Sequence, residues 1–167
     1  DTAGQVSRLT YRELDQQSAR LAGWMAARGL GVGDRIACML PRSPQLLVAV
    51  VATWRLGAVY QPLFTAFGPD AVDYRLGRAD TRLVITDAAN RHKFDGLESC
   101  PPVLALGGAS EAHPQDLSWD EALASEALPS RARPARALQR VARIFTSVIL
   151  LVSTCYGCRR RASSHNV

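Results

Sequence analysis

The chain has 167 residues, of which 47% are hydrophobic and 21% charged, so it suits one globular domain and is not disordered throughout. The longest strongly apolar run, residues 148–152 with their neighbours, is far shorter than the roughly 20 residues of a membrane-spanning helix. The sequence does not begin with the basic and then apolar residues of a secretory signal peptide, and we therefore expect a cytoplasmic protein. The net charge of +5 comes from residues 127–167, with eight Arg and no acid, whereas residues 1–126 carry 12 basic and 15 acidic residues, or 12 − 15 = −3.

The first predicted element is a helix that begins after Thr10 and ends at Gly29. Thr10 and Glu13 have the spacing of a capping box, in which each side chain accepts a hydrogen bond from the backbone amide of the other residue. The apolar residues that follow fall on one helical face, and they are Tyr11, Leu14, Leu21, Ala22 and Met25. This pattern predicts a surface helix that covers a core.

Strands and helices then alternate along the chain. We expect strands over residues 35–40, 58–63, 82–86 and 103–106, and helices over residues 45–56 and about 68–79. A second capping box at Ser118 and Glu121 predicts a short helix near the end of this region. Strands separated by helices are typical of a largely parallel sheet. The predicted fold class is therefore α/β, built from βαβ units.

The helix predicted over residues 45–56 is apolar on nearly every side. Ser43 is its predicted cap and Pro44 its first residue, where proline needs no hydrogen-bond partner. Its apolar side chains are Leu46, Leu47, Val48, Val50, Val51 and Trp54. Such a helix is normally covered by other elements, and we expect it to expose an apolar surface where that cover is missing.

Several short patterns suggest a binding site, and each also has a structural interpretation. The glycine-rich stretch 29–33 is similar to a phosphate-binding loop, but such a loop follows a strand and opens a helix. Here the order is reversed, so we interpret the stretch as a helix-to-strand turn. Asp87 follows a predicted strand, where α/β proteins often place ligand contacts, and is equally well a turn residue. His92 and His113 lie in predicted loops without a nucleophile at a recognisable spacing, and we expect both to be solvated.

The four cysteines imply no disulfide framework. Cys38 lies in an apolar strand pattern and is predicted to be a small buried residue, and Cys100 precedes a Pro-Pro turn. Cys155 and Cys158 have the spacing of a thioredoxin-like redox pair or of half a zinc site. His165 alone cannot supply the remaining zinc ligands. A redox module that uses Cys155 and Cys158 remains one alternative function.

Three stretches, in order, resemble the N-terminal region of the AMP-binding, adenylate-forming enzymes. Residues 9–14 (Leu-Thr-Tyr-Arg-Glu-Leu) are similar to the family's opening Leu-Thr-Tyr-x-Glu-Leu, and residues 31–37 to its Gly-x-Gly-Asp-x-Val turn into a strand. Residues 54–63 are similar to its Lys-x-Gly-Ala-x-x-x-Pro-Leu segment, and residues 82–87 to the strand that follows. The amino-acid sequence of residues 62–68 is most similar to that of acetyl- or medium-chain acyl-CoA synthetases. The resemblance implies an incomplete N-terminal region of the large domain of such a synthetase.

The resemblance also implies an activity. The family joins a carboxylic acid to coenzyme A, using ATP and Mg²⁺ and passing through an acyl-adenylate, as in fatty acid metabolism. A Ser/Thr/Gly-rich loop ending in Pro-Lys-Gly holds the triphosphate, an Asp binds the ribose, and a C-terminal Lys stabilises the developing charge. None of these has a match in this sequence. We therefore expect no catalytic, cofactor-binding or metal-ligating residue in this chain, and no ligase activity from it alone.

The composition changes after Glu126, and we divide the chain into a synthetase region, residues 1–126, and a basic, disordered tail, residues 127–167. Residues 144–147 (Ile-Phe-Thr-Ser) resemble the lead into the phosphate loop, but apolar residues stand where its glycines are expected. We hypothesise that a shift of reading frame at or before Ser147 replaced the expected glycines. A shift near Glu126 would also account for the absence of acidic residues after that position. The alternative is a short binding module whose Arg-rich tail contacts nucleic acid or an anionic membrane, although no aromatic or amphipathic pattern indicates a specific nucleic acid or a membrane.

Overall fold

A computed structural model describes residues 8–128 of the chain. They lie within the first of the two units into which the chain divides, Asp1–Ser130. The Arg-rich tail and the pair Cys155 and Cys158 lie outside the described residues. The predictions made for them, including the disordered tail, the shift of reading frame and the redox module, therefore remain predictions.

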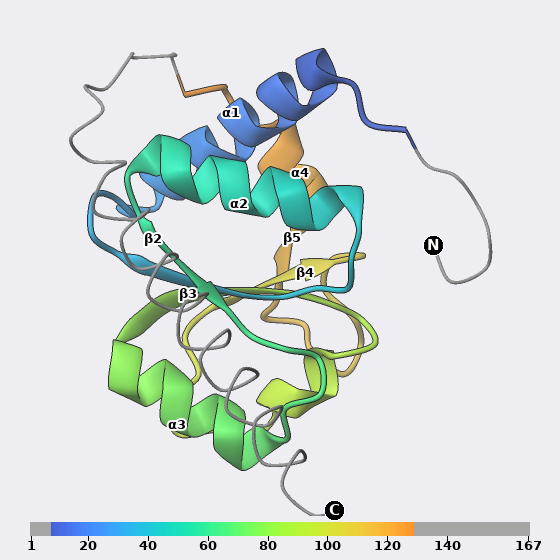
Figure 1. Ribbon diagram of the computed structural model, residues 1–167. Coiled ribbons are helices and arrows are strands. Elements are labelled where there is room, and N and C mark those ends of the chain that lie inside the picture. Colours follow the sequence, from blue (N-terminus) through green and yellow to red (C-terminus); the bar gives the residue numbers. More distant parts are fainter. Residues whose placement is uncertain (1–7, 129–167) are drawn as a thin grey trace, which may run out of the picture. The chain divides into compact units, whose positions relative to one another are not determined.

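Five strands form one sheet at the centre of the described fold (Figure 1). The strands are β1 (Arg35–Met39), β2 (Val59–Pro62), β3 (Thr81–Asp87), β4 (Val103–Leu106) and β5 (Leu117–Ser118). Their order across the sheet is β2-β1-β3-β4-β5, and every neighbouring pair is parallel. The predicted α/β class with a largely parallel sheet is confirmed. Strand β5 was not predicted, because two residues are too few to show an alternating pattern.

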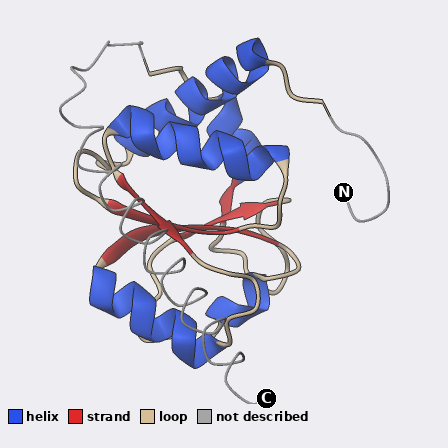
Figure 2. Cartoon of the chain, viewed as in Figure 1, coloured by secondary structure: helices blue, strands red, loops and turns tan. Residues whose placement is uncertain are grey.

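Helices cover both faces of this sheet (Figure 2). They are α1 (Tyr11–Ala27), α2 (Pro44–Leu56), α3 (Pro69–Ala79), the 3₁₀ turn η1 (Arg91–Phe94) and α4 (Trp119–Ala124). The helices α1, α2 and α4 lie on one face, and α3 and η1 lie on the other. The predicted helices are present within about two residues of their expected ends, and only η1 was missed.

Successive residues of β1 point to opposite faces of the sheet, which produces two cores. Ile36 and Cys38 pack in the core under α1, α2 and α4. Ala37 and Met39 pack in the second core, against Val72, Leu76 and Phe94 from α3 and η1. Because both of its faces are covered, β1 is apolar along its length after Arg35 rather than alternating with polar residues.

The predicted caps form at the helix starts. At α1 the Glu13 carboxylate accepts from the Thr10 amide at 2.7 Å, and the Glu13 amide donates to the Thr10 hydroxyl at 3.2 Å. At α4 only half of the predicted capping box is present among the described contacts, since Ser118 Oγ accepts from the Glu121 amide at 3.5 Å. The stretch 29–33 is the helix-to-strand turn that was expected. Its Gly31 amide donates to Asp34 Oδ2 at 2.7 Å and is therefore not open to a phosphate.

Helix α1 also binds the segment that follows α4. The Leu128 amide donates to the Ala19 carbonyl oxygen at 2.8 Å, and Leu128 packs on the edge of the first core. A Cβ atom built on Gly23 would lie 2.0 Å from the Glu126 carbonyl oxygen. Only glycine allows the backbone of this segment to approach the helix so closely.

We predict that Gly23→Ala destabilises the chain. Helix propensity alone favours alanine over an internal glycine by about 1 kcal/mol, but the new methyl group would collide with backbone and cost about 1–3 kcal/mol. Gly77→Ala is the matched control, since its Cβ would meet no backbone and would lie 2.7 Å from Ser99 Oγ, which can rotate away, and 3.3 Å from Ser99 Cβ. Urea unfolding of both variants measures the effect, and an equal or higher stability for Gly23→Ala contradicts the prediction.

Cys38 is the small buried residue that its strand pattern predicted, with 2% of its surface exposed. Burial raises the pKa of its thiol to about 12. The neighbouring Tyr60 hydroxyl is also partly buried, and desolvation raises its pKa as well. Both groups are therefore neutral over the physiological pH range.

We predict that Cys38 resists alkylation in the folded chain at pH 8.5. The thiolate is the reactive species, and a pKa of about 12 leaves far less thiolate than an ordinary cysteine has at this pH. Iodoacetamide labelling followed by peptide mass spectrometry should show modification of Cys38 at least ~100-fold slower in buffer than in urea. Equal rates in the two solvents would mean that β1 is not buried.

Candidate functional site

The candidate site is the edge of the sheet where the parallel strands end. The chain leaves β1 through α2 on one face toward β2, and it leaves β3 through η1 on the other face toward β4. The connections after the neighbouring strands β1 and β3 therefore run in opposite directions. This is the topological switch point, and ligands of open α/β sheets bind outside the carboxyl ends of the strands at such a point. The segments that flank it are residues 40–43 after β1 and residues 88–90 after β3.

Polar residues at the end of β3 order this edge. The Thr86 hydroxyl donates to the Met39 carbonyl oxygen at 3.2 Å and ties β3 to the end of β1. Asp87 Oδ1 accepts from the Asn90 amide at 3.0 Å and from its side-chain amide at 2.8 Å. The structure therefore favours the turn interpretation of Asp87, because its carboxylate holds the loop after β3.

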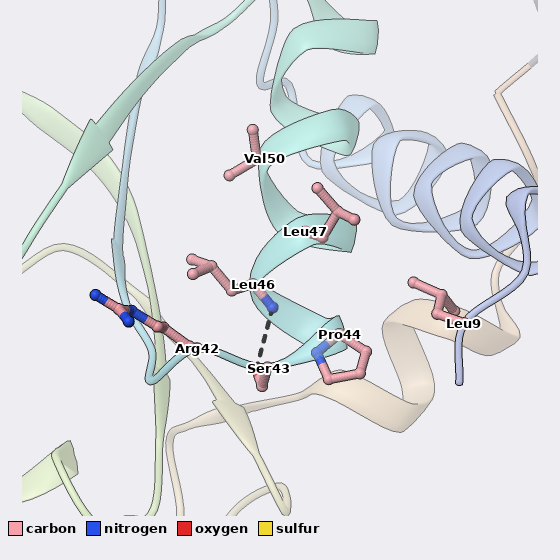
Figure 3. A pocket seen from close by; sticks show the side chains of 7 residues that line it. All are labelled: Leu9, Arg42, Ser43, Pro44, Leu46, Leu47 and Val50. Atoms are coloured by element: carbon pink, nitrogen blue, oxygen red, sulfur yellow. Dashed lines mark hydrogen bonds between the residues drawn. The ribbon is translucent and has the colours of Figure 1, made fainter. Parts of the chain in front are cut away.

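A pocket of about 510 Å³ opens beside this edge, where the loop after β1 enters α2 (Figure 3). Its lining consists of Leu9, Arg42, Ser43, Pro44, Leu46, Leu47 and Val50. Ser43 Oγ caps α2 by accepting from the Leu46 amide at 3.3 Å. Figure 3 shows Leu9 on the side of Pro44 and Leu47, with Arg42 pointing away from them. The lining holds no histidine, carboxylate or cysteine, so the pocket offers an apolar contact surface and no general base.

A second polar cluster joins η1 to the connection between β4 and β5. Arg91 is 8% exposed, and its guanidinium binds both oxygens of the buried Asp116, at 2.5 and 2.9 Å. The hydrogen bonds to Asp116 raise the pKa of Arg91 further. Arg91 Nη1 also donates to Asp95 Oδ1 at 2.9 Å. A bidentate pair shielded from water is the strong form of this interaction.

His113 belongs to the same cluster, and the expectation that it is a solvated loop residue is wrong. His113 Nε2 lies 2.8 Å from Asp95 Oδ1, and Nδ1 lies 3.4 Å from Ser110 Oγ. The order serine, histidine, aspartate matches a nucleophile, a base and an orienting acid. However, 3.4 Å is long for a hydrogen bond from a hydroxyl, and Asp95 already pairs with Arg91. We interpret the cluster as a structural clamp. His92 is exposed, as expected.

We predict that Asp116→Ala destabilises the chain by about 3 kcal/mol, because it removes the buried carboxylate that binds the Arg91 guanidinium at two points and leaves it the half-exposed Asp95. Glu111→Ala removes a carboxylate from the same connection at an exposed position, and it should change the stability by less than about 0.5 kcal/mol. Thermal unfolding followed by circular dichroism compares the two. Similar melting temperatures for both variants would show that the Arg91–Asp116 pair is dispensable.

Over residues 8–128, no three His, Cys, Asp or Glu side chains are arranged to hold a metal ion. In the same range no helix has the length and apolarity to cross a bilayer. The sequence named no catalytic residue, which remains a prediction, and the described residues at the edge of the sheet form loops and helix ends.

Comparison with known proteins places this scaffold in a family. The family model described as AMP-binding enzyme matches residues 2–147. The acetyl-coenzyme A synthetase of Alkalilimnicola ehrlichii is 37% identical over 113 residues, which are 62% of this chain and 18% of that protein. The crystal structure of an acyl-CoA synthetase from Brucella canis superposes with a TM-score of 0.71 at 38% identity, over 78% of this chain and 25% of that one.

A benzoate CoA ligase from Burkholderia xenovorans shares the fold with a TM-score of 0.64 at 23% identity. The chain thus spans only about a fifth to a quarter of the length of these relatives. The match to the family model covers most of the chain, and it agrees with the residues that first suggested the resemblance. The chain belongs to the family of AMP-binding, adenylate-forming enzymes, and its described fold matches one part of the acyl-CoA synthetase from Brucella canis.

Proposed function

We propose that this chain supplies the first part of the large domain of an ATP-dependent carboxylate–CoA ligase, acting in the cytoplasm in the metabolism of short or medium-chain acids. The observation that supports this most is the parallel sheet in the order β2-β1-β3-β4-β5, which superposes on an acyl-CoA synthetase at 38% identity. The acetyl-coenzyme A synthetases among its relatives favour acetate as the acid.

The complete reaction has two steps. A carboxylate oxygen attacks the α-phosphorus of ATP to form an acyl-adenylate and release pyrophosphate, and the thiol of coenzyme A then displaces AMP. Both steps need groups that offset the charge developing on phosphate. In this part of the enzyme the role of the chain is to build the switch point of the first sheet and to position the loops at its carboxyl edge.

We further propose that the chain alone does not catalyse the ligation. Its sequence has no Pro-Lys-Gly segment, and the buried Arg91 is already paired with Asp116 and Asp95. At the carboxyl edge Asp87 is also engaged in structure, because its carboxylate accepts from Asn90. The polypeptide that holds ATP must therefore be provided from outside the described fold.

A chimera tests this proposal. Residues 8–128 replace the matched region of the Brucella canis acyl-CoA synthetase, and formation of AMP and acyl-CoA is measured with ATP, Mg²⁺, coenzyme A and either acetate or octanoate. We expect the chimera to retain at least a few per cent of the parent activity, and the full 167-residue chain assayed alone to give none. A soluble, folded chimera without activity would contradict the proposed role, and so would turnover by the chain alone.

A further inference from the structure

Asp95 and Gly96 form the turn that follows η1. They are the only aspartate–glycine pair in the sequence, and no asparagine precedes a glycine. Both residues are exposed, and 49% of the Asp95 side-chain surface is open to solvent. Water therefore reaches this turn, and water is the co-reactant in the chemistry by which aspartate–glycine pairs rearrange.

Gly96 makes the backbone of this turn easy to rearrange. Its φ is +68°, a conformation that glycine adopts without steric cost. A Cβ atom built on Gly96 would meet no atom of the described residues within 4 Å, so no neighbouring group crowds this position. The lack of a side chain also leaves the Gly96 amide nitrogen open to approach by the carboxyl group of Asp95.

Two neighbours bind the Asp95 carboxylate. Arg91 Nη1 donates to Asp95 Oδ1 at 2.9 Å, and His113 Nε2 donates to the same oxygen at 2.8 Å. An ionised carboxylate only accepts, so Nε2 carries the proton of this contact. These contacts restrict the rotation that brings the carboxyl group to the Gly96 nitrogen.

The backbone of Asp95 provides a second restraint. Its φ is −76° and its ψ is 133°, which is an extended conformation. A five-membered ring that contains the Gly96 nitrogen requires this nitrogen to eclipse Cβ of Asp95, and an extended ψ places it far from that position. The side-chain contacts and the backbone must therefore both change before the two groups can react.

We propose that Asp95–Gly96 is a modification site at which the chain converts spontaneously to isoaspartate, and that the hydrogen bonds from Arg91 and His113 slow the conversion. The Gly96 nitrogen attacks Cγ of the protonated Asp95 carboxyl group, a C–N bond forms, and the hydroxyl group leaves with the amide proton as water. Water then adds to one carbonyl carbon of the resulting succinimide and breaks its bond to nitrogen. Opening at the backbone carbonyl gives isoaspartate, and opening at the side-chain carbonyl restores aspartate.

The conversion removes one tie of the clamp. In isoaspartate the chain runs through the side-chain methylene group, so the backbone gains one carbon atom and the free carboxylate is attached directly to Cα. The carboxylate can then no longer reach Arg91 and His113 as before. Arg91 keeps its pair with Asp116, so we expect a modified chain that remains folded and melts at a lower temperature.

The test ages the full 167-residue chain at mildly acidic pH and physiological temperature. Peptide mass spectrometry with electron-transfer fragmentation identifies isoaspartate at each position, because this method cleaves the additional backbone bond. We expect isoaspartate to accumulate at Asp95 but not at Asp70, an exposed aspartate that precedes alanine. Asp95→Asn is the positive control, because an asparagine–glycine pair forms the same succinimide with loss of ammonia.

Variants of His113 test the restraint. His113→Ala should speed the conversion about two- to fivefold, the effect expected from the loss of one partly exposed ion pair. His113→Gln retains a side-chain N–H donor and should keep the slow rate. His92→Ala is the matched control, since it removes an exposed histidine of η1 that lies outside the clamp, and it should leave the rate unchanged.

Four outcomes would overturn the inference. Isoaspartate forms in Asp95→Asn but not at Asp95 of the unaltered chain, or it forms at Asp95 no faster than at Asp70. In the third, His113→Ala converts at the rate of the unaltered chain, or His113→Gln converts as fast as His113→Ala. The fourth needs no variant: the unaltered chain converts equally fast in buffer and in urea, where the contacts of Asp95 are broken.

Discussion

The structure depends on one constraint, which is that the central strand β1 must be covered on both faces. A parallel sheet cannot leave one face in water, because its strands are joined by helices that must pack back onto it. Placing α2 on one face and α3 on the other satisfies this requirement. The connection after β1 passes through α2 on one face and the connection after β3 passes through η1 on the other, and this divergence creates the switch point. The same packing that stabilises the fold therefore produces the place where a ligand can bind.

The central strand β1 is covered on both faces, whereas the outer face of α2, which covers it, is not. Helix α2 shields Ile36 and Cys38 from water with one face and is held to α1 partly by Arg55 Nε, which donates to Ser18 Oγ at 3.0 Å. Its other face remains half-exposed. In a domain of one sheet and two helical layers that outer face would be polar. An apolar outer face is typical of a helix that is covered on both sides.

The polar interactions of the described residues serve the scaffold. The buried pair of Arg91 and Asp116 fixes the connection that leads to β5 and α4, and Asp95 links it to His113. Breaking a buried pair costs far more than an exposed one, so these charges are poorly suited to changing partners during a reaction.

The sequence by itself determined the elements whose signals are local. Thr10 and Glu13 marked the start of α1, the apolar run after Arg35 marked a buried strand, and the order of helix and strand around residues 29–33 excluded a phosphate loop. Tertiary structure alone decided what depends on residues far apart in the chain. The pairing of Arg91 with Asp116 spans 25 positions, and the approach of Glu126 to Gly23 joins the two ends of the described fold. The sequence could show that α2 is apolar all round, but only packing decides which face the chain covers, because burial is a property of neighbours and not of a residue.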